Sequence, residues 1–187
     1  MFPRTPHLRA RSLLAVHLEL TNHSARDVTG IRLNKKTLTG SRSIVEFPPV
    51  AVLGPGAATT VLLGVDFTDS IQPVEFTLLS SIGEVGVVIS PPVGELMRSV
   101  TMSPERWDLE HRKLRGMTEC KKKAPKLSDD VMMCLRVFAG RMISSQELVL
   151  LSVQIGVEEC TVVANCSNMA VASLLANEVA NSFSKTY

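Results

Sequence analysis

Short runs of alternating apolar residues dominate positions 11 to 97. The clearest run covers residues 14 to 20, where every second residue is Leu or Val and the residues between them are Ala, His and Glu. A period of two places the apolar side chains on one side of a strand, whereas a helix would repeat every three to four residues. This part of the chain is therefore predicted to be all β.

The same pattern predicts further strands in this part of the chain. They lie at 28–33, 44–47, 59–67, 74–79 and 85–89. Gly, Pro, Asn and Asp punctuate them, as at Leu53 to Gly56 and at Asp69-Ser70, and these residues favour turns. Short strands without helices between them favour an immunoglobulin-like antiparallel β-sandwich at 11–93, preceded by a disordered segment at 1–10.

The paired prolines Pro91 and Pro92 mark a change of pattern. Paired prolines cannot continue a central strand, so the domain junction is predicted there. Beyond it, Ser103 followed by a proline and an acid is a helix start, and the helix is expected to run from 104 to about 115 and end at Gly116.

The rest of the second half mixes strand and helix patterns. We expect a charged loop at 121–125, a short helix at 129–137, and strands at 148–155 and 160–164 joined by a tight turn near Gly156. Asn168 is the expected cap of a final helix. The apolar face of that helix is predicted to hold Val171, Leu174, Leu175, Val179 and Phe183. Residues 94–187 thus read as an α+β platform subdomain.

Composition and motifs argue against an enzyme. The four histidines have no Ser, Cys or acid at a catalytic spacing, and no phosphate-binding loop or metalloprotease motif is present. We expect no catalytic residue, cofactor, metal site or small-molecule substrate. A net charge of +2 argues against nucleic-acid binding. The absence of an apolar run of about 18 residues, and of a signal peptide, predicts a soluble protein.

The four cysteines lie in the C-terminal third of the chain and form no CxxC pair. They are interpreted as reduced thiols of a cytosolic protein. An extracellular adhesion module with oxidised cysteines is the alternative, and a count of free thiols distinguishes the two.

Basic residues concentrate between Thr101 and Lys126, a segment that contains eight Lys and Arg residues and only four acidic ones. They could contact acidic lipid or an acidic partner, or they could form a solvated face. The candidates for acidic-surface contact are Arg112, Lys113, Lys121, Lys122 and Lys123. Trp107, the single tryptophan, is either a core residue of its helix or a binding anchor.

Several motifs, in the same order, resemble the C-terminal appendage of the beta subunit of adaptor protein complex three. Residues 64–72 read GVDFTDSIQ and resemble its G-[IV]-[DN]-F-x-D-S-x-Q run, and residues 91–97 resemble its P-P-V-G-E-L run. Similar runs follow at 100–103, 114–117, 138–141 and 148–151. The resemblance extends from about Leu13 to the end of the chain.

The resemblance implies an ear of a heterotetrameric vesicle coat adaptor, with a sandwich followed by a platform. Such ears are non-catalytic. They recruit accessory proteins through short linear motifs, and join other adaptor subunits through a trunk that this chain lacks. The implied location is cytoplasmic, peripheral on Golgi, endosomal and coated-vesicle membranes, with indirect membrane association and transport towards lysosomes and related organelles.

Two departures from the family pattern concern the platform. Between Lys121 and Arg141 this chain is shorter, which leaves open whether a strand is missing or replaced by the 129–137 helix. Related ears carry an aromatic-rich helix that anchors Phe-containing peptides. Here that helix keeps only Trp107, and the anchor position falls on His111. Trp107, His111 and Arg115 are the candidate protein-binding residues.

Overall fold

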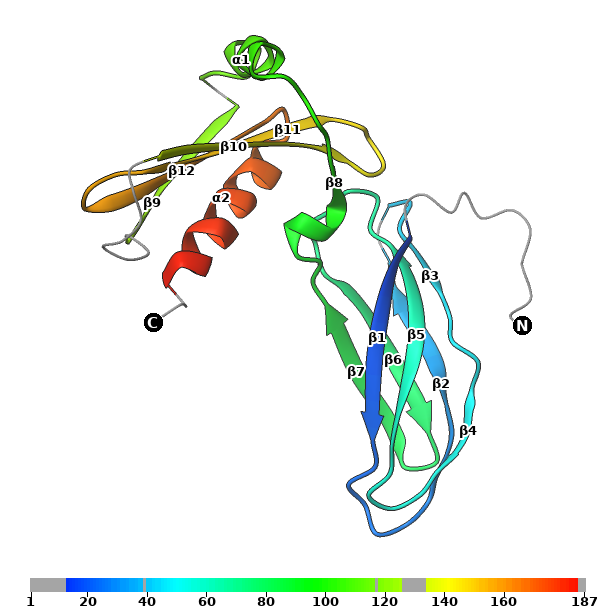
Figure 1. Ribbon diagram of the computed structural model, residues 1–187. Coiled ribbons are helices and arrows are strands. Elements are labelled where there is room, and N and C mark those ends of the chain that lie inside the picture. Colours follow the sequence, from blue (N-terminus) through cyan, green and yellow to red (C-terminus); the bar gives the residue numbers. More distant parts are fainter. Residues whose placement is uncertain (1–12, 39, 117, 126–133, 185–187) are drawn as a thin grey trace. The chain divides into compact units, whose positions relative to one another are not determined.

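The computed structural model describes residues 13–38, 40–116, 118–125 and 134–184. The chain divides into two compact units, Met1–Pro91 and Pro92–Tyr187. Figure 1 shows strands throughout the first unit, and strands with two α-helices in the second. The expected disordered segment at 1–10 lies outside the described residues.

The first unit is an antiparallel sandwich of seven described strands, as the alternating pattern predicted. They are β1 (Leu13–Thr21), β2 (Val28–Thr37), β3 (Ser43–Val45), β4 (Val50–Leu53), β5 (Ala58–Asp66), β6 (Val74–Ser80) and β7 (Gly83–Ile89). One sheet has the order β1-β5-β3 and the other β4-β2-β6-β7. Sequence reasoning missed β4, because its four residues lie directly between a proline pair and a Gly-Pro turn.

The core of the first unit comes from the inward side of each strand. Leu63 and Val65 of β5 are buried, as are Val74 and Phe76 of β6, and each pair is separated by one outward residue. Strand β2 changes phase at Gly30, which has a φ of 65°. That left-handed conformation suits glycine, and it lets β2 bury residues on both sides of the irregularity.

The second unit is built on one five-stranded antiparallel sheet with the order β8-β10-β11-β12-β9. Its strands are β8 (Met97–Ser99), β9 (Glu119–Pro125), β10 (Cys134–Met142), β11 (Leu148–Ile155) and β12 (Glu159–Cys166). The short 3-10 helix η1 (Val93–Leu96) precedes β8. Figure 1 shows α1 (Pro104–Lys113) over one face of the sheet and α2 (Met169–Ser184) over the other.

Two expectations for this unit are wrong. The segment 121–125 is not a loop but part of β9, paired with β12. The helix expected at 129–137 is contradicted where it is described, because residues from Cys134 onward form β10, paired with β11; residues 129–133 lie outside the described residues. A strand therefore fills the region where one was expected to be missing or replaced.

The strands at 148–155 and 159–166 confirm the predicted hairpin, and Gly156 lies in its turn. The Gly156 N–H donates to the carbonyl of Glu159, and a Cβ on Gly156 would lie 2.9 Å from that oxygen. Asn168 caps α2, since its Oδ1 accepts a hydrogen bond from the Ala170 N–H. Leu174 does not belong to the buried face as expected: it is 36% exposed, and small residues such as Ala172 and Ala176 pack there instead.

Helix α1 begins where the sequence predicted. Ser103 is the N-cap, its hydroxyl accepts a hydrogen bond from the Arg106 N–H, and Pro104 follows at the first helical position. A hydrogen bond between the Ser103 side chain and the carboxylate of Glu105 holds the pKa of Glu105 below its ordinary value. The helix ends at Lys113, slightly before the predicted end.

Replacing Ser103 with alanine is expected to remove both interactions. Loss of the N-cap lowers the free energy of unfolding by about 1 kcal/mol, and the pKa of Glu105 rises because its charged form loses a donor. Urea denaturation and NMR titration of the Glu105 carboxyl measure the two effects. Ser103→Thr keeps the hydroxyl and is the control. An alanine variant with unchanged stability and unchanged Glu105 pKa would contradict the assigned cap.

Candidate functional site

Trp107 lies against the sheet of the second unit. Its side chain is buried, at 7% exposure, and its indole N–H donates to the carbonyl of Phe138 on β10 at 3.2 Å. The imidazole of His111, one turn further along α1, stacks on the indole with ring centroids 4.7 Å apart. The core interpretation of Trp107 therefore has direct structural support.

The three candidate protein-binding residues do not form one cluster. Trp107 and His111 lie together on α1, and His111 is half-buried. Arg115 comes after the C-cap residue Leu114 and is exposed. The structure thus joins two of the three residues, and the indole is turned towards the sheet.

The five candidate residues for acidic-surface contact are also divided. Lys121 and Lys123 are exposed on one side of β9, whereas Lys122 is half-buried and points to the opposite side. Lys123 pairs with Glu159 at 2.7 Å, and Lys113 pairs with Glu110 at 3.2 Å. Arg112 is exposed on α1. These ion pairs neutralise part of the basic charge.

The lysines of β9 occupy one edge of the sheet, since β9 pairs only with β12 among the described strands. Charged side chains on an edge strand hinder pairing with another chain, and Lys is the commonest guard of this kind. We expect Lys121→Val with Lys123→Val to increase self-association, measured by sedimentation velocity over rising protein concentration. Arginine at both positions is the control. A valine variant that self-associates no more than the parent protein would show that these lysines do not prevent pairing at this edge.

At the other end of the sheet order, β8 pairs with only the last residues of β10, and the rest of β10 exposes three large apolar side chains. Leu135, Val137 and Phe138 of β10 are 61%, 43% and 54% exposed. Sequence reasoning missed this site because the Ser-Asp-Asp sequence before it resembles a helix start. The alternation of Leu135 and Val137 with Arg136 was the available strand signal.

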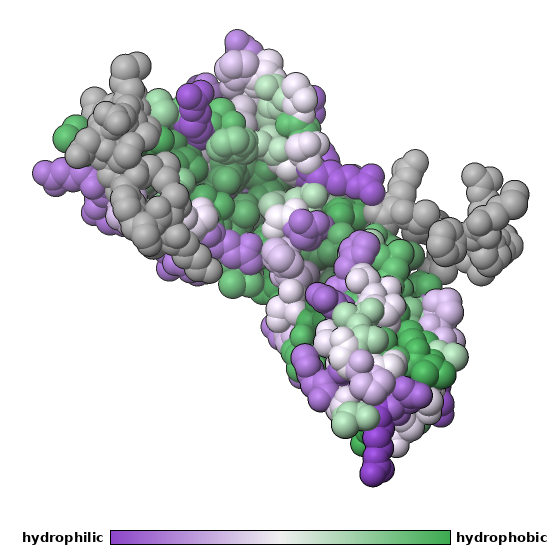
Figure 2. Space-filling view, turned by 60° about the horizontal axis from the view of Figure 1, so that its bottom comes forward, coloured by the Kyte–Doolittle hydropathy of each residue, from purple (hydrophilic) through white to green (hydrophobic). Residues whose placement is uncertain are grey.

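A groove of about 200 Å³ lies on the side of the sheet that faces α2, and of the three exposed residues only Phe138 lines it. Leu135 and Val137 lie on the opposite face of β10, because side chains alternate along a strand. The lining of the groove includes Met97, Phe138, Gly140, Leu151 and Leu175. Helix α2 packs mainly over β9 and β12, so this part of β10 remains uncovered by it. Figure 2 shows hydrophobic surface gathered on the second unit beside polar surface.

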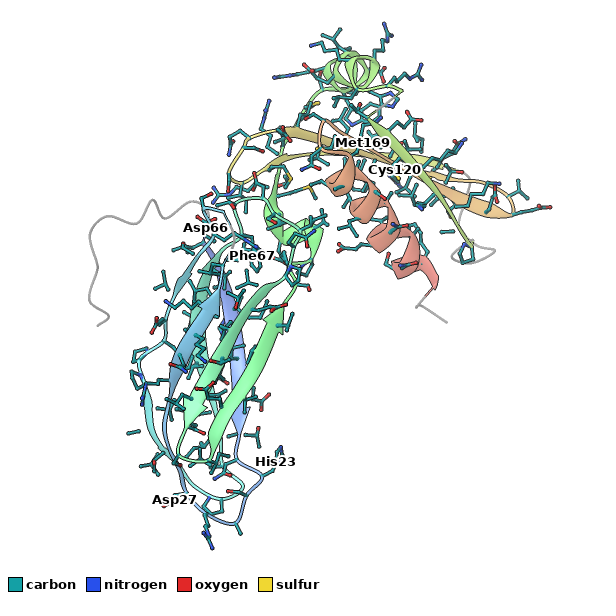
Figure 3. All side chains as sticks on the ribbon, turned by 180° about the vertical axis from the view of Figure 1, so that it is seen from behind. His23, Asp27, Asp66, Phe67, Cys120 and Met169 are labelled. Carbon is teal, nitrogen blue, oxygen red and sulfur yellow. The ribbon has the colours of Figure 1, made fainter. Side chains whose placement is uncertain are left out.

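The sandwich has a larger groove of its own, of about 400 Å³. Its lining is mostly apolar and includes Leu20, Val28, Ile31, Leu53, Leu78, Ile82 and Val85. His23 lies at its rim, at the end of the sandwich opposite to Asp66 and Phe67 (Figure 3). Neither groove could be found from motifs, because the walls are mainly apolar side chains that belong to no recognisable motif.

The titratable residues that were weighed as catalytic candidates remain apart. His17 and His23 are exposed, on β1 and in the loop after it. The described part of the chain has no group of three or more His, Cys, Asp or Glu side chains placed to hold a metal ion. The four cysteines are free thiols, with Cys160 and Cys166 buried and Cys120 and Cys134 half-buried.

No helix among the described residues is long and apolar enough to cross a membrane.

Two protein families match the chain, one for each part. Residues 1–72 match the family of the C-terminal part of the beta-1 subunit of clathrin-adaptor complex 3, and residues 94–183 match "AP-3 complex subunit beta-1, C-terminal domain". Together the two matches cover most of the chain.

Curated relatives agree with these families. The chain is 32% identical over 203 residues to the AP-3 complex subunit beta-2 of Mus musculus, a match that covers 95% of this chain and 18% of that protein. It is 36% identical over 118 residues to the Mus musculus AP-3 complex subunit beta-1 and 34% identical to that of Homo sapiens, covering 63% of this chain and 11% of each relative. The chain thus spans less than a fifth of the length of these relatives.

Proposed function

Because this chain belongs to the family of C-terminal regions of AP-3 complex beta subunits, we propose that it is a non-catalytic docking appendage of an adaptor complex in vesicle-mediated transport. It acts by offering surfaces to accessory proteins, and it makes or breaks no covalent bond.

The exposed apolar residues at the β10 edge carry this proposal. Leu135, Val137 and Phe138 are exposed, and Phe138 also lines the groove on the α2 side of the sheet. Burying an apolar side chain is favourable, and exposed apolar surface beside a groove is typical of a site where another protein binds. The groove in the sandwich offers a second surface of the same kind.

The partners are accessory proteins that carry short linear motifs. Contacts of this kind bury little area and are individually weak, but many copies in a coat supply avidity. Other adaptor subunits join through parts of the subunit outside this chain. The resulting location is the cytoplasmic surface of Golgi, endosomal and coated-vesicle membranes, on routes towards lysosomes and related organelles.

A contact with acidic lipid through the basic residues has weaker support. Lys113 and Lys123 are already paired with acids, and Lys122 points away from its two neighbours on β9. An exposed basic residue adds only about 1 kcal/mol near an anionic surface. Co-sedimentation with phosphatidylserine vesicles that is strong and falls steeply with salt would favour the lipid contact over protein docking.

Proximity labelling tests the docking function. A beta subunit that ends in this chain, and the same subunit truncated before it, are each fused to a labelling enzyme near the trunk. Both are expected to label the other adaptor subunits, and only the subunit with this chain labels an additional set of accessory proteins. Identical sets from the two fusions would reject the proposal.

A further inference from the structure

The two edges of the second unit's sheet are protected to different degrees. At β9, three consecutive lysines and the Lys123–Glu159 ion pair occupy the edge. At β10, Leu135 and Val137 are exposed and the strand contains no lysine. Natural proteins usually blunt such edges with several charges, whereas Arg136 is the single charged residue among residues 134–139 of β10. This weaker protection indicates a place where another strand can bind.

Within the described part of the chain, the backbone of β10 has no partner strand along this edge before Ala139. Strand β8 pairs with β10 only from Gly140 to Met142, and the Val100 N–H then donates to the carbonyl of Ala139. Residues two apart along a strand direct their N–H and C=O groups to the same side. Leu135 and Val137 therefore direct their N–H and C=O groups to the same edge as Ala139 does. On that edge no strand among the described residues pairs with Leu135 or Val137.

The charge on this half of the sheet has one sign. Strands β8 and β10 together carry Arg98, Arg136 and Arg141 and no acidic residue, and β11 carries no charge. Arg136 is exposed between Leu135 and Val137, on the opposite side of the strand from them. Charge complementarity favours an acidic partner.

We propose, building on the docking role above, that the open edge of β10 at 134–139 binds an extended acidic segment of a partner protein as an additional antiparallel strand. Backbone hydrogen bonds to Leu135 and Val137 supply affinity, and alternate side chains supply specificity. Aliphatic side chains of the segment lie beside Leu135 and Val137, and acidic ones lie beside Arg136. A second copy of this chain fits less well, because its own β10 would bring arginines and no acid.

Two synthetic peptides probe this edge. TVEVEVT has the proposed alternation of aliphatic and acidic residues, and TVKVKVT is its charge-reversed control. We expect saturable binding of TVEVEVT to the full chain, and binding of TVKVKVT at least about tenfold weaker. N-methylation of alternate amides of TVEVEVT removes the donors that pair with β10 without changing the side chains, and is expected to abolish binding.

Variants of the protein complete the test. Val137→Pro removes an outward N–H, a change that an edge strand tolerates. It is expected to weaken the binding of TVEVEVT by about tenfold or more. Val137→Thr keeps the N–H and is the matched control. Arg136→Glu is expected to reverse the preference between the two peptides. Trp107 fluorescence verifies that each variant is folded, because the indole donates to Phe138 on the same strand.

Three results would overturn the proposal. They are no preference for TVEVEVT over TVKVKVT, full binding of the N-methylated peptide, and a dimer of the parent chain that Val137→Pro converts to monomers. In the last case the edge serves a second copy. If the peptide experiments contradict the proposal but the two fusions still label different sets of proteins, the docking function stands and the β10 edge is not its site.

Discussion

Replacing Phe67 with alanine is expected to lower the free energy of unfolding of the first unit by about 3 to 5 kcal/mol. Phe67 directly follows β5 and is 1% exposed. Its carbonyl accepts the Ser70 N–H, and the Asp66 carboxylate accepts the Thr68 N–H, so the turn fixes the ring in the core. Removing the ring leaves a cavity that the constrained turn cannot fill.

Hydrogen exchange measured by mass spectrometry locates this loss. In Phe67→Ala, amides of strands β1 to β7 are expected to lose protection, whereas those of strands β8 to β12 and helix α2 keep it because the second unit has its own core. Phe67→Leu keeps most of the apolar volume and serves as the control. Equal loss of protection in both units, or a loss of stability below about 1 kcal/mol, would contradict this account of the core.

Replacing Trp107 with alanine is expected to destabilise the second unit by a similar amount, about 3 to 5 kcal/mol. The indole is buried against β10, and the Phe138 carbonyl loses its donor. Urea denaturation followed by circular dichroism measures the change. This result separates a core residue from a ligand anchor, since an anchor would reduce binding and leave stability nearly unchanged.

His111→Ala is the companion variant for Trp107→Ala. It removes the stacking partner and keeps the indole in place, so the expected loss is only about 0.5 to 1.5 kcal/mol. A larger loss for His111→Ala than for Trp107→Ala would show that the imidazole, and not the indole, holds α1 on the sheet.

The parts of the fold that could be predicted from the sequence depend on local patterns. Strand β1 alternates and β11 is mostly apolar, and helices α1 and α2 begin at side chains that cap them, Ser103 and Asn168. In each case a physical signal lies within a few residues of the structure that it predicts.

Strands β9 and β10 could not be predicted because distant pairing decides them. The three lysines of β9 have low strand propensity, but seven residues of β9 pair in register with β12. The helix start signal before β10 is overruled by pairing of Cys134 to Arg141 with β11. The exposed edge of β10 was equally hidden, because a sequence does not show which strand ends at the border of a sheet.

The candidate site residues were chosen by chemical type, and the structure separates them by position. Trp107 is turned into the unit and the lysines of β9 divide between two faces. The surfaces that remain open are aliphatic, at the β10 edge and in the sandwich groove. Such surfaces carry no motif, so only a structure reveals them.

Rescue of cargo sorting tests the central claim most directly. Cells that lack the beta subunit receive either a beta subunit ending in this chain or the same subunit truncated before it, and the amount of lysosomal membrane protein at the cell surface is measured. The account predicts that both subunits assemble into the complex, but only the one with this chain returns cargo to lysosomes. Equal rescue by the truncated subunit would contradict it.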